Sequence, residues 1–130
     1  MKIVVSGYFA PLHRGHIEYF KKARKFGKLI VIVNNDNQLL KEKGIKYPIE
    51  DRLAVIRNIR YVDKVVESID KDGSVCQTLI KVRPDIFANG GDRFKDEIPE
   101  LEVCNNLRIK VVDGLGKKVQ SSSNIINSLK

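Results

Sequence analysis

The chain has 130 residues, of which 42% are hydrophobic and 31% are charged. This composition indicates one globular domain over residues 1–130 and argues against a disordered, collagen-like or fibrous chain. The 24 lysines and arginines exceed the 16 aspartates and glutamates, giving a net charge of +8 that favours an anionic partner: a phosphorylated small molecule, nucleic acid or an acidic membrane.

Short β-branched runs alternate with helical patterns from one end of the chain to the other. Lys2–Val5 and the fully apolar Leu29–Val33 are expected strands, and Gly15–Phe26 between them is an expected helix. Residues 34–47 are expected to form a polar loop. The remaining expected elements are a helix at Pro48–Arg60, a strand at Lys64–Glu67, a helix at Ser74–Val82, a strand at Asp85–Ala88, a helix at Glu100–Leu107, a strand at Ile109–Asp113 and a helix at Ser122–Leu129.

This alternation predicts an α/β fold, a Rossmann-like, doubly wound, parallel five-stranded sheet with helices on both faces. In such sheets, ligands bind beyond the carboxyl ends of the strands, where the strand order reverses. The segments that follow the expected strands hold His13 and most of the glycines of the chain, and His16 lies in the first turn of the helix that follows the first segment. They are therefore the first place to look for a functional site.

The strongest motif is Gly-Tyr-Phe-Ala-Pro-Leu-His-Arg-Gly-His at residues 7–16, which follows the first strand and opens the first helix. Gly7 permits a sharp turn, and Gly15 keeps a side chain away from the helix start. A helix N-terminus attracts phosphate through unpaired N–H groups and its dipole. His13 and His16 are three residues apart there, so both can reach one phosphate. The coincidence of turn, helix start and paired histidines argues against two incidental polar residues.

Two later segments also suit phosphate. Ser121, Ser122 and Ser123 precede the last expected helix, where hydroxyl and N–H groups can point to one place, although a plain serine N-cap is the alternative. Asn-Gly-Gly-Asp-Arg at residues 89–93 follows the fourth strand, and its Arg93 can grip a phosphate with a planar fork. A turn with a surface arginine is the alternative there.

These motifs resemble the nucleotidyltransferase superfamily, and within it the cytidylyltransferase-like family. His-x-Gly-His at residues 13–16 is similar to the superfamily signature. Arg60-Tyr61-Val62-Asp63 is similar to a dimer-interface segment of bacterial glycerol-3-phosphate cytidylyltransferases, and residues 121–123 resemble a segment that holds the triphosphate. The chain departs from the family at Ala10, where Asp is usual, and at residues 114–120, which lack an Arg-Thr pair.

The resemblance implies transfer of a nucleotide from CTP, or from ATP, to a small phosphate monoester with release of pyrophosphate. CTP is the preferred nucleotide because residues 60–63 resemble the cytidylyltransferase segment, and the same resemblance implies a homodimer. Mg²⁺ is expected to be held mainly through the nucleotide phosphates, without protein metal ligands. The alternatives are an adenylyltransferase acting on a sugar phosphate or other phosphorylated small molecule, and a nucleotide-binding module without turnover.

The family pattern also implies roles for individual residues. It implies four catalytic residues: His13, His16, Lys46 and Arg93. Among the lysines of this segment, Lys46 is chosen by position over Lys41 and Lys43. Nucleotide binding falls to Gly7, Tyr8, Phe9, His13, Gly15, His16, Gly90, Gly91, Asp92, Arg93, Gln120, Ser121, Ser122 and Ser123. The implied residues for binding the acceptor substrate are Asn34, Asn35, Asp36, Lys46 and Arg52. For Arg52, the alternative is that it braces the fold.

Cys76 and Cys104 lie on apolar faces of expected helices and form no CxxC pair, so we expect free thiols and a cytoplasmic chain. The longest purely aliphatic run is Leu29–Val33, far short of a membrane span, and the N-terminus does not resemble a signal peptide. No long basic tail is present, and aromatic residues do not alternate with basic ones, so we expect no nucleic-acid partner.

Overall fold

A computed structural model describes residues 1–88 and 98–112, and strands and helices alternate throughout this part of the chain. The elements are β1 (Lys2–Gly7), α1 (Arg14–Arg24), β2 (Lys28–Val33), α2 (Asp36–Lys43), α3 (Ile49–Arg57), β3 (Lys64–Glu67), α4 (Cys76–Val82), β4 (Ile86–Ala88), α5 (Glu100–Asn106) and β5 (Lys110–Val112). The expected helix at Ser122–Leu129 lies outside the described residues.

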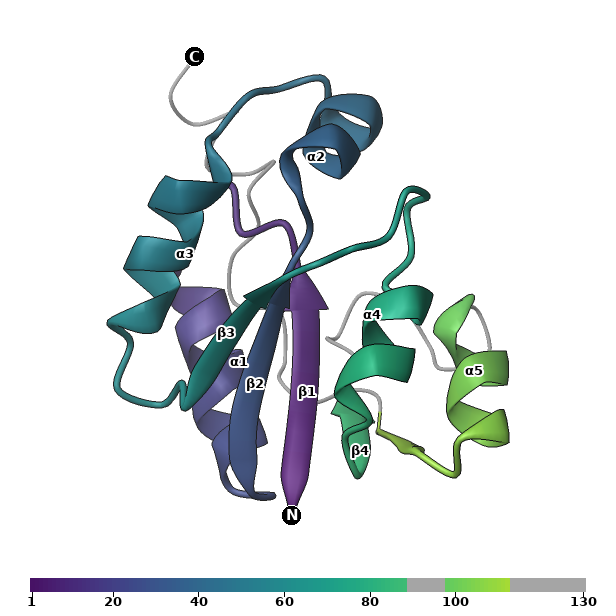
Figure 1. Ribbon diagram of the computed structural model, residues 1–130. Helices are drawn as coiled ribbons and strands as arrows, with labels where there is room; N and C mark the ends of the chain where they lie inside the picture. Colours follow the sequence, from purple (N-terminus) through teal and green to yellow (C-terminus); the bar gives the residue numbers. More distant parts are fainter. Residues whose placement is uncertain (89–97, 113–130) are drawn as a thin grey trace.

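The strands form one parallel five-stranded sheet in the order β3-β2-β1-β4-β5 (Figure 1). The chain moves outward from β1 through β2 to β3 and then crosses to the other side of β1 for β4 and β5. The strand order therefore reverses beside β1, and a ligand crevice is expected at the carboxyl end of that strand. The predicted doubly wound α/β fold is confirmed.

Helices cover both faces of the sheet because its strands are apolar on both faces. In β1, Ile3 and Val5 pack with Phe20 of α1, whereas Val4 between them packs with Leu79 of α4. In Figure 1, α1 and α3 lie on one face of the sheet and α4 and α5 on the other. The purely aliphatic run predicted as a doubly buried strand, Leu29–Val33, is buried at every position.

Residues 34–47 are not one loop, contrary to the sequence prediction, because they contain α2. The Asn35 side chain accepts a hydrogen bond from the Gln38 backbone N–H at 2.9 Å, and the Gln38 side chain accepts one from Asn35 N–H at 3.0 Å. This reciprocal capping box starts the helix, and Gly44, with φ of 67°, ends it. Leu39 is the only fully buried apolar side chain of α2, so apolar periodicity did not reveal the helix.

The two cysteines are free thiols on helices of the same face. Cys104 of α5 is fully buried, and Cys76 at the start of α4 is half-buried. Burial raises the pKa of the Cys104 thiol to about 11, and it also raises the pKa of Cys76. None of the described helices has the length and apolar character that crossing a bilayer requires.

Candidate functional site

The loop between β1 and α1 packs closely against its own glycine. Phe9 has φ of 51°, and its ring lies so near Gly7 that a Cβ added there would stand 2.9 Å from Phe9 Cζ. The same ring meets the His16 imidazole edge to face, with centroids 4.9 Å apart, and Phe20 of α1 at 5.4 Å. A side chain at position 7 would therefore disturb the ring that supports His16.

His13 and His16 together build the N-terminal cap of α1. His13 is the N-cap residue, and its Nδ1 accepts a hydrogen bond from Gly15 N–H at 3.1 Å. The backbone N–H of His13 donates to His16 Nδ1 at 3.2 Å, and the two rings stack with centroids 3.8 Å apart. Because each Nδ1 is an acceptor, a neutral ring carries its proton on Nε2. The N-terminus of α1 thus holds two imidazole Nε2–H donors next to each other.

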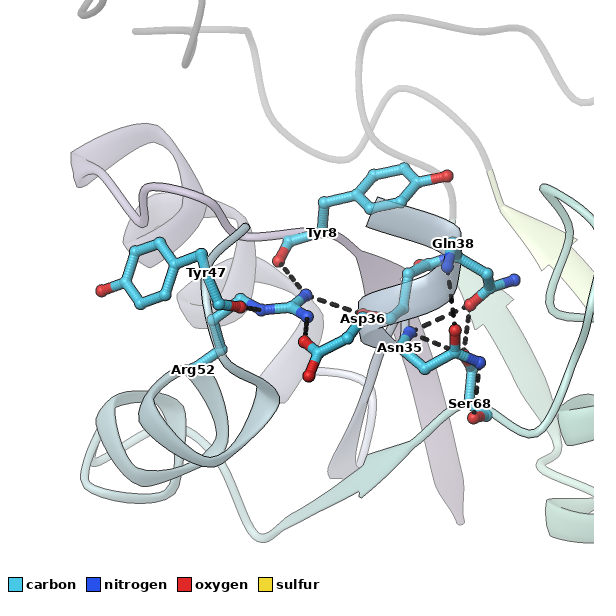
Figure 2. Close-up of polar contacts among 8 residues, drawn as sticks. Tyr8, Asn35, Asp36, Gln38, Tyr47, Arg52 and Ser68 are labelled. Carbon is cyan, nitrogen blue, oxygen red and sulfur yellow. Dashed lines mark hydrogen bonds and ion pairs between the residues drawn. The ribbon is translucent and has the colours of Figure 1, made fainter. Parts of the chain in front are cut away.

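The Arg52 side chain of α3 forms hydrogen bonds with three segments at the carboxyl edge of the sheet, as Figure 2 shows. Its Nε donates to the Tyr47 carbonyl at 2.8 Å, and its Nη1 donates to the carbonyls of Tyr8 at 3.0 Å and Asn34 at 2.6 Å. Its Nη2 pairs with Asp36 at 2.8 Å. The side chain is completely buried, so the structure favours bracing of the fold, the alternative to acceptor binding.

The loops after β2 and β3 are joined by a second polar network, of which Figure 2 shows Asn35, Gln38 and Ser68. The Asn35 carboxamide donates to the carbonyls of Ser68 at 3.1 Å and Asp70 at 2.9 Å. Gln38 donates to the Ser74 carbonyl at 2.9 Å, and its carboxamide oxygen accepts from the Ser68 hydroxyl. The carboxamide of Asn35, a predicted acceptor-binding residue, is therefore engaged within the protein.

Two lysines near the end of α2 are candidates for contact with phosphate. Lys46, the predicted one, is exposed in the segment between α2 and α3. Lys43, at the end of α2, places its ammonium 5.4 Å from the centre of the Tyr8 ring, in the loop that leads to the histidines. The sequence prediction considered Lys43 and chose Lys46 by its position before Tyr47 and Pro48, and the contact of Lys43 with Tyr8 becomes visible only in the structure.

The remaining predicted phosphate contacts fall in parts of the chain that the structure does not describe. Their proximity to the histidine pair stays a prediction. They are Gly90, Gly91, Asp92, Arg93, Gln120, Ser121, Ser122 and Ser123.

The predicted dimer segment, Arg60–Asp63, connects α3 to the edge strand β3. Arg60 is exposed and donates to the Tyr61 hydroxyl at 2.8 Å. The Asp63 carboxylate accepts from Leu29 N–H at 2.8 Å and pairs with Arg24 at 2.9 Å, so it connects β3 with β2 and α1. Asp63 thus has a role within the chain, and dimerisation stays a prediction.

Comparison with known proteins agrees with the geometry. The sequence profile of the cytidylyltransferase-like family matches residues 4–127. The FAD synthase of Pyrococcus abyssi is 41% identical over 124 residues, which cover 92% of this chain and 77% of the relative. The bifunctional protein HldE of Campylobacter curvus is 32% identical over 133 residues, which cover 98% of this chain and 27% of that longer protein.

A solved structure shows the same fold. The lipopolysaccharide core biosynthesis protein from Thermoplasma volcanium superimposes with a TM-score of 0.74 at 28% identity, covering 92% of this chain and 98% of its own. The profile match spans nearly the whole sequence, and the relatives share both its fold and a substantial part of its residues. The chain therefore belongs to the cytidylyltransferase-like family of the nucleotidyltransferase superfamily.

Proposed function

We propose that the protein is an adenylyltransferase, which transfers AMP from ATP to the phosphate monoester of a small molecule and releases pyrophosphate. FAD is AMP joined through a pyrophosphate bond to FMN, so relatives named FAD synthase favour adenylyl transfer over the cytidylyl transfer that the resemblance put first. FMN is accordingly the first acceptor to test. The likeness to a lipopolysaccharide core biosynthesis protein supports a sugar phosphate as the second acceptor class.

The observation that carries the proposal is the unusual chemistry of the α1 cap. The caps of α1 and α2 have the same reciprocal geometry, but α2 uses Asn35 and Gln38 where α1 uses His13 and His16. Asn and Gln are ordinary capping residues, so starting a helix does not require imidazole. The imidazoles add two Nε2–H donors on rigid rings beside a helix N-terminus, which is a site suited to phosphate.

The reaction needs positioning more than it needs a base. A phosphate monoester is already an anion near pH 7, so its oxygen can attack the α-phosphorus of ATP directly. The bond from that phosphorus to the bridging oxygen breaks in line, and pyrophosphate leaves with the electron pair. We assign the Nε2–H groups of His13 and His16 to the α-phosphate oxygens, where negative charge develops. Lys46 and Arg93 would offset the remaining charge, and residues 121–123 would hold the β- and γ-phosphates.

Mg²⁺ is the cofactor we propose, and it would offset the charge of the triphosphate. Among residues 1–88 and 98–112, no three His, Cys, Asp or Glu side chains come together as a metal site. Mg²⁺ bound to nucleotides is commonly held by phosphate oxygens and water, and that arrangement fits this set of side chains. The histidines would then remain hydrogen-bond donors.

The double variant His13→Asn/His16→Gln tests the proposal, because it copies the cap of α2 onto α1. We expect its circular dichroism and Tm to match the wild type, while pyrophosphate release falls by at least about 10²- to 10³-fold. The wild type is assayed with ATP and with CTP against FMN, a sugar 1-phosphate and glycerol 3-phosphate. Faster release with CTP would restore the cytidylyl alternative. Binding of ATP without pyrophosphate release from any acceptor would indicate a binding module.

A further inference from the structure

A cavity of about 710 Å³ lies on the α4 side of the sheet, next to the edge strand β3. In Figure 1, α4 and α5 lie beside the β1–β4 half of this face, and the cavity is lined by α4 together with β2 and β3. The apolar part of the lining comes from two strands, α4 and the segment after β3, through Ile30, Val66, Val82 and Ile69. Its charged part includes four lysines: Lys2, Lys28, Lys64 and Lys81.

The strand register explains why the lysines gather. Each of the three neighbouring strands β1, β2 and β3 begins with a lysine. Lys2 is paired with Lys28, and Lys64 is paired with Ile30, two residues further along β2. Side chains two residues apart in a strand share a face, so all three lysines lie on the face that α4 packs against. Lys81 of α4 adds a fourth ammonium group to that face.

The four lysines of this cluster outnumber the two carboxylates that line the same cavity, Asp63 and Glu67. Within residues 1–88 and 98–112 the ion pairs are those of Arg24 with Asp63 and of Arg52 with Asp36, so none of the four lysines is ion-paired. Of these two carboxylates, Asp63 is already bound to Arg24, which leaves Glu67 as the one lining carboxylate without an ion pair among the described residues. Four unpaired ammonium groups around one cavity repel one another, and an anion bound among them would remove that repulsion.

The lysine cluster is separate from the candidate nucleotide site. Lys2, Lys28 and Lys64 are the first residues of their strands, whereas His13 and His16 follow the carboxyl end of β1. The six residues of β1 span about 20 Å, so a small ligand at one end does not reach the other.

We propose that this cavity is a second binding site, for a phosphorylated small molecule that also has an aromatic or aliphatic part. Its volume falls within the range of about 300–1,000 Å³ that is usual for small-molecule sites. The lysines supply compact positive charges for phosphate, and the side chains of Ile30, Val66 and Val82 supply apolar contact. A second copy of this chain fits poorly, because a two-fold axis would bring the same lysines face to face.

The test uses 1-naphthyl phosphate as the probe and follows backbone amides by ¹H–¹⁵N NMR during a titration. We expect the probe to change the chemical shifts of the backbone amides of Lys28–Ile30, Lys64–Val66 and α4. We expect 1-naphthol and inorganic phosphate each to bind more weakly than the probe. The variant Lys28→Gln/Lys64→Gln should bind the probe about tenfold more weakly, since each exposed charge contributes modestly. The matched variant Lys21→Gln/Lys25→Gln removes the same charge from exposed positions around the end of α1 and should bind as the wild type does.

Three results would overturn the proposal. Shifts confined to residues 7–16 would mean that the probe binds at the histidine loop alone. Equal weakening in both double variants would indicate diffuse attraction by net charge. Concentration-dependent shifts of the cavity amides without probe, together with a dimer in sedimentation, would make a second copy the occupant. None of these measurements requires turnover, so the result is independent of the proposed adenylyl transfer.

Discussion

Replacement of Arg52 by methionine tests the structural role of the arginine most directly. Methionine keeps much of the unbranched stem but removes every donor, so the carbonyls of Tyr8, Asn34 and Tyr47 lose a hydrogen bond. A buried acceptor left unsatisfied costs about 1–3 kcal/mol. Asn34 is buried and incurs most of this cost, whereas the carbonyls of the half-buried Tyr8 and Tyr47 can recover water. We expect the free energy of unfolding to fall by about 2–4 kcal/mol.

The ion pair contributes little to this loss. The Asp36 side chain is 54% exposed, and an ion pair with one partner in water is worth about 0–1 kcal/mol. Asp36→Asn keeps an oxygen that can accept from Arg52 and removes only the charge. This matched variant should therefore lose less than about 1 kcal/mol.

Urea unfolding and thermal melting of the two variants measure the difference. Domains of this kind are stable by about 5–15 kcal/mol, so Arg52→Met should remain folded at 25 °C with a Tm lower by roughly 10 °C. A loss below about 1 kcal/mol for Arg52→Met would show that water replaces the guanidinium. Equal losses in Arg52→Met and Asp36→Asn would show that the ion pair dominates. Either result refutes the reasoning.

Two further predictions concern the histidine loop and the core. Gly7→Ala brings a Cβ to 2.9 Å from Phe9, so we expect a loss of about 1–3 kcal/mol and a shift of the His16 ring resonances, read by urea unfolding and ¹H–¹³C NMR. The folded Cys104 thiol keeps its proton up to its pKa of about 11, whereas the unfolded thiol releases its proton near 9.0. Stability from this thiol should therefore be complete below pH 9 and disappear towards pH 11, and the fall should be smaller in Cys104→Ala, which keeps only the contribution of Cys76.

The sheet was predictable because its signal is local. The run Leu29–Val33 has no polar residue and is bounded by Lys28 and Asn34, which is typical of a parallel strand buried on both faces. Helix α2 was missed because its signal is of another kind. Its signal is the spacing of Asn35 and Gln38 and the terminal Gly44, which apolar periodicity does not detect.

The candidate site was likewise predictable from the sequence only in part. A short motif predicts that His13 and His16 lie at the start of a helix, and the structure confirms that placement, while their functional role stays a prediction. The environment of Arg52 could not be found from sequence, since three of its four hydrogen bonds go to backbone carbonyls. A carbonyl belongs to every residue and leaves no pattern in the sequence, so only the fold reveals which ones an arginine meets.

These contacts fit the kind of catalysis proposed. An acceptor that is already an anion gains nothing from a strong base, so the rate depends on how firmly donors are held where charge develops. The loop before His13 is fixed by Arg52 through the Tyr8 carbonyl, and the loops after β2 and β3 are fixed to each other through Gln38. Buried polar side chains that satisfy backbone carbonyls thus connect the segments of the carboxyl edge at which we propose that a nucleotide binds. Paired imidazole donors in the proposed reaction would need such support, because a donor that moved with the loop would stabilise the transition state no better than water does.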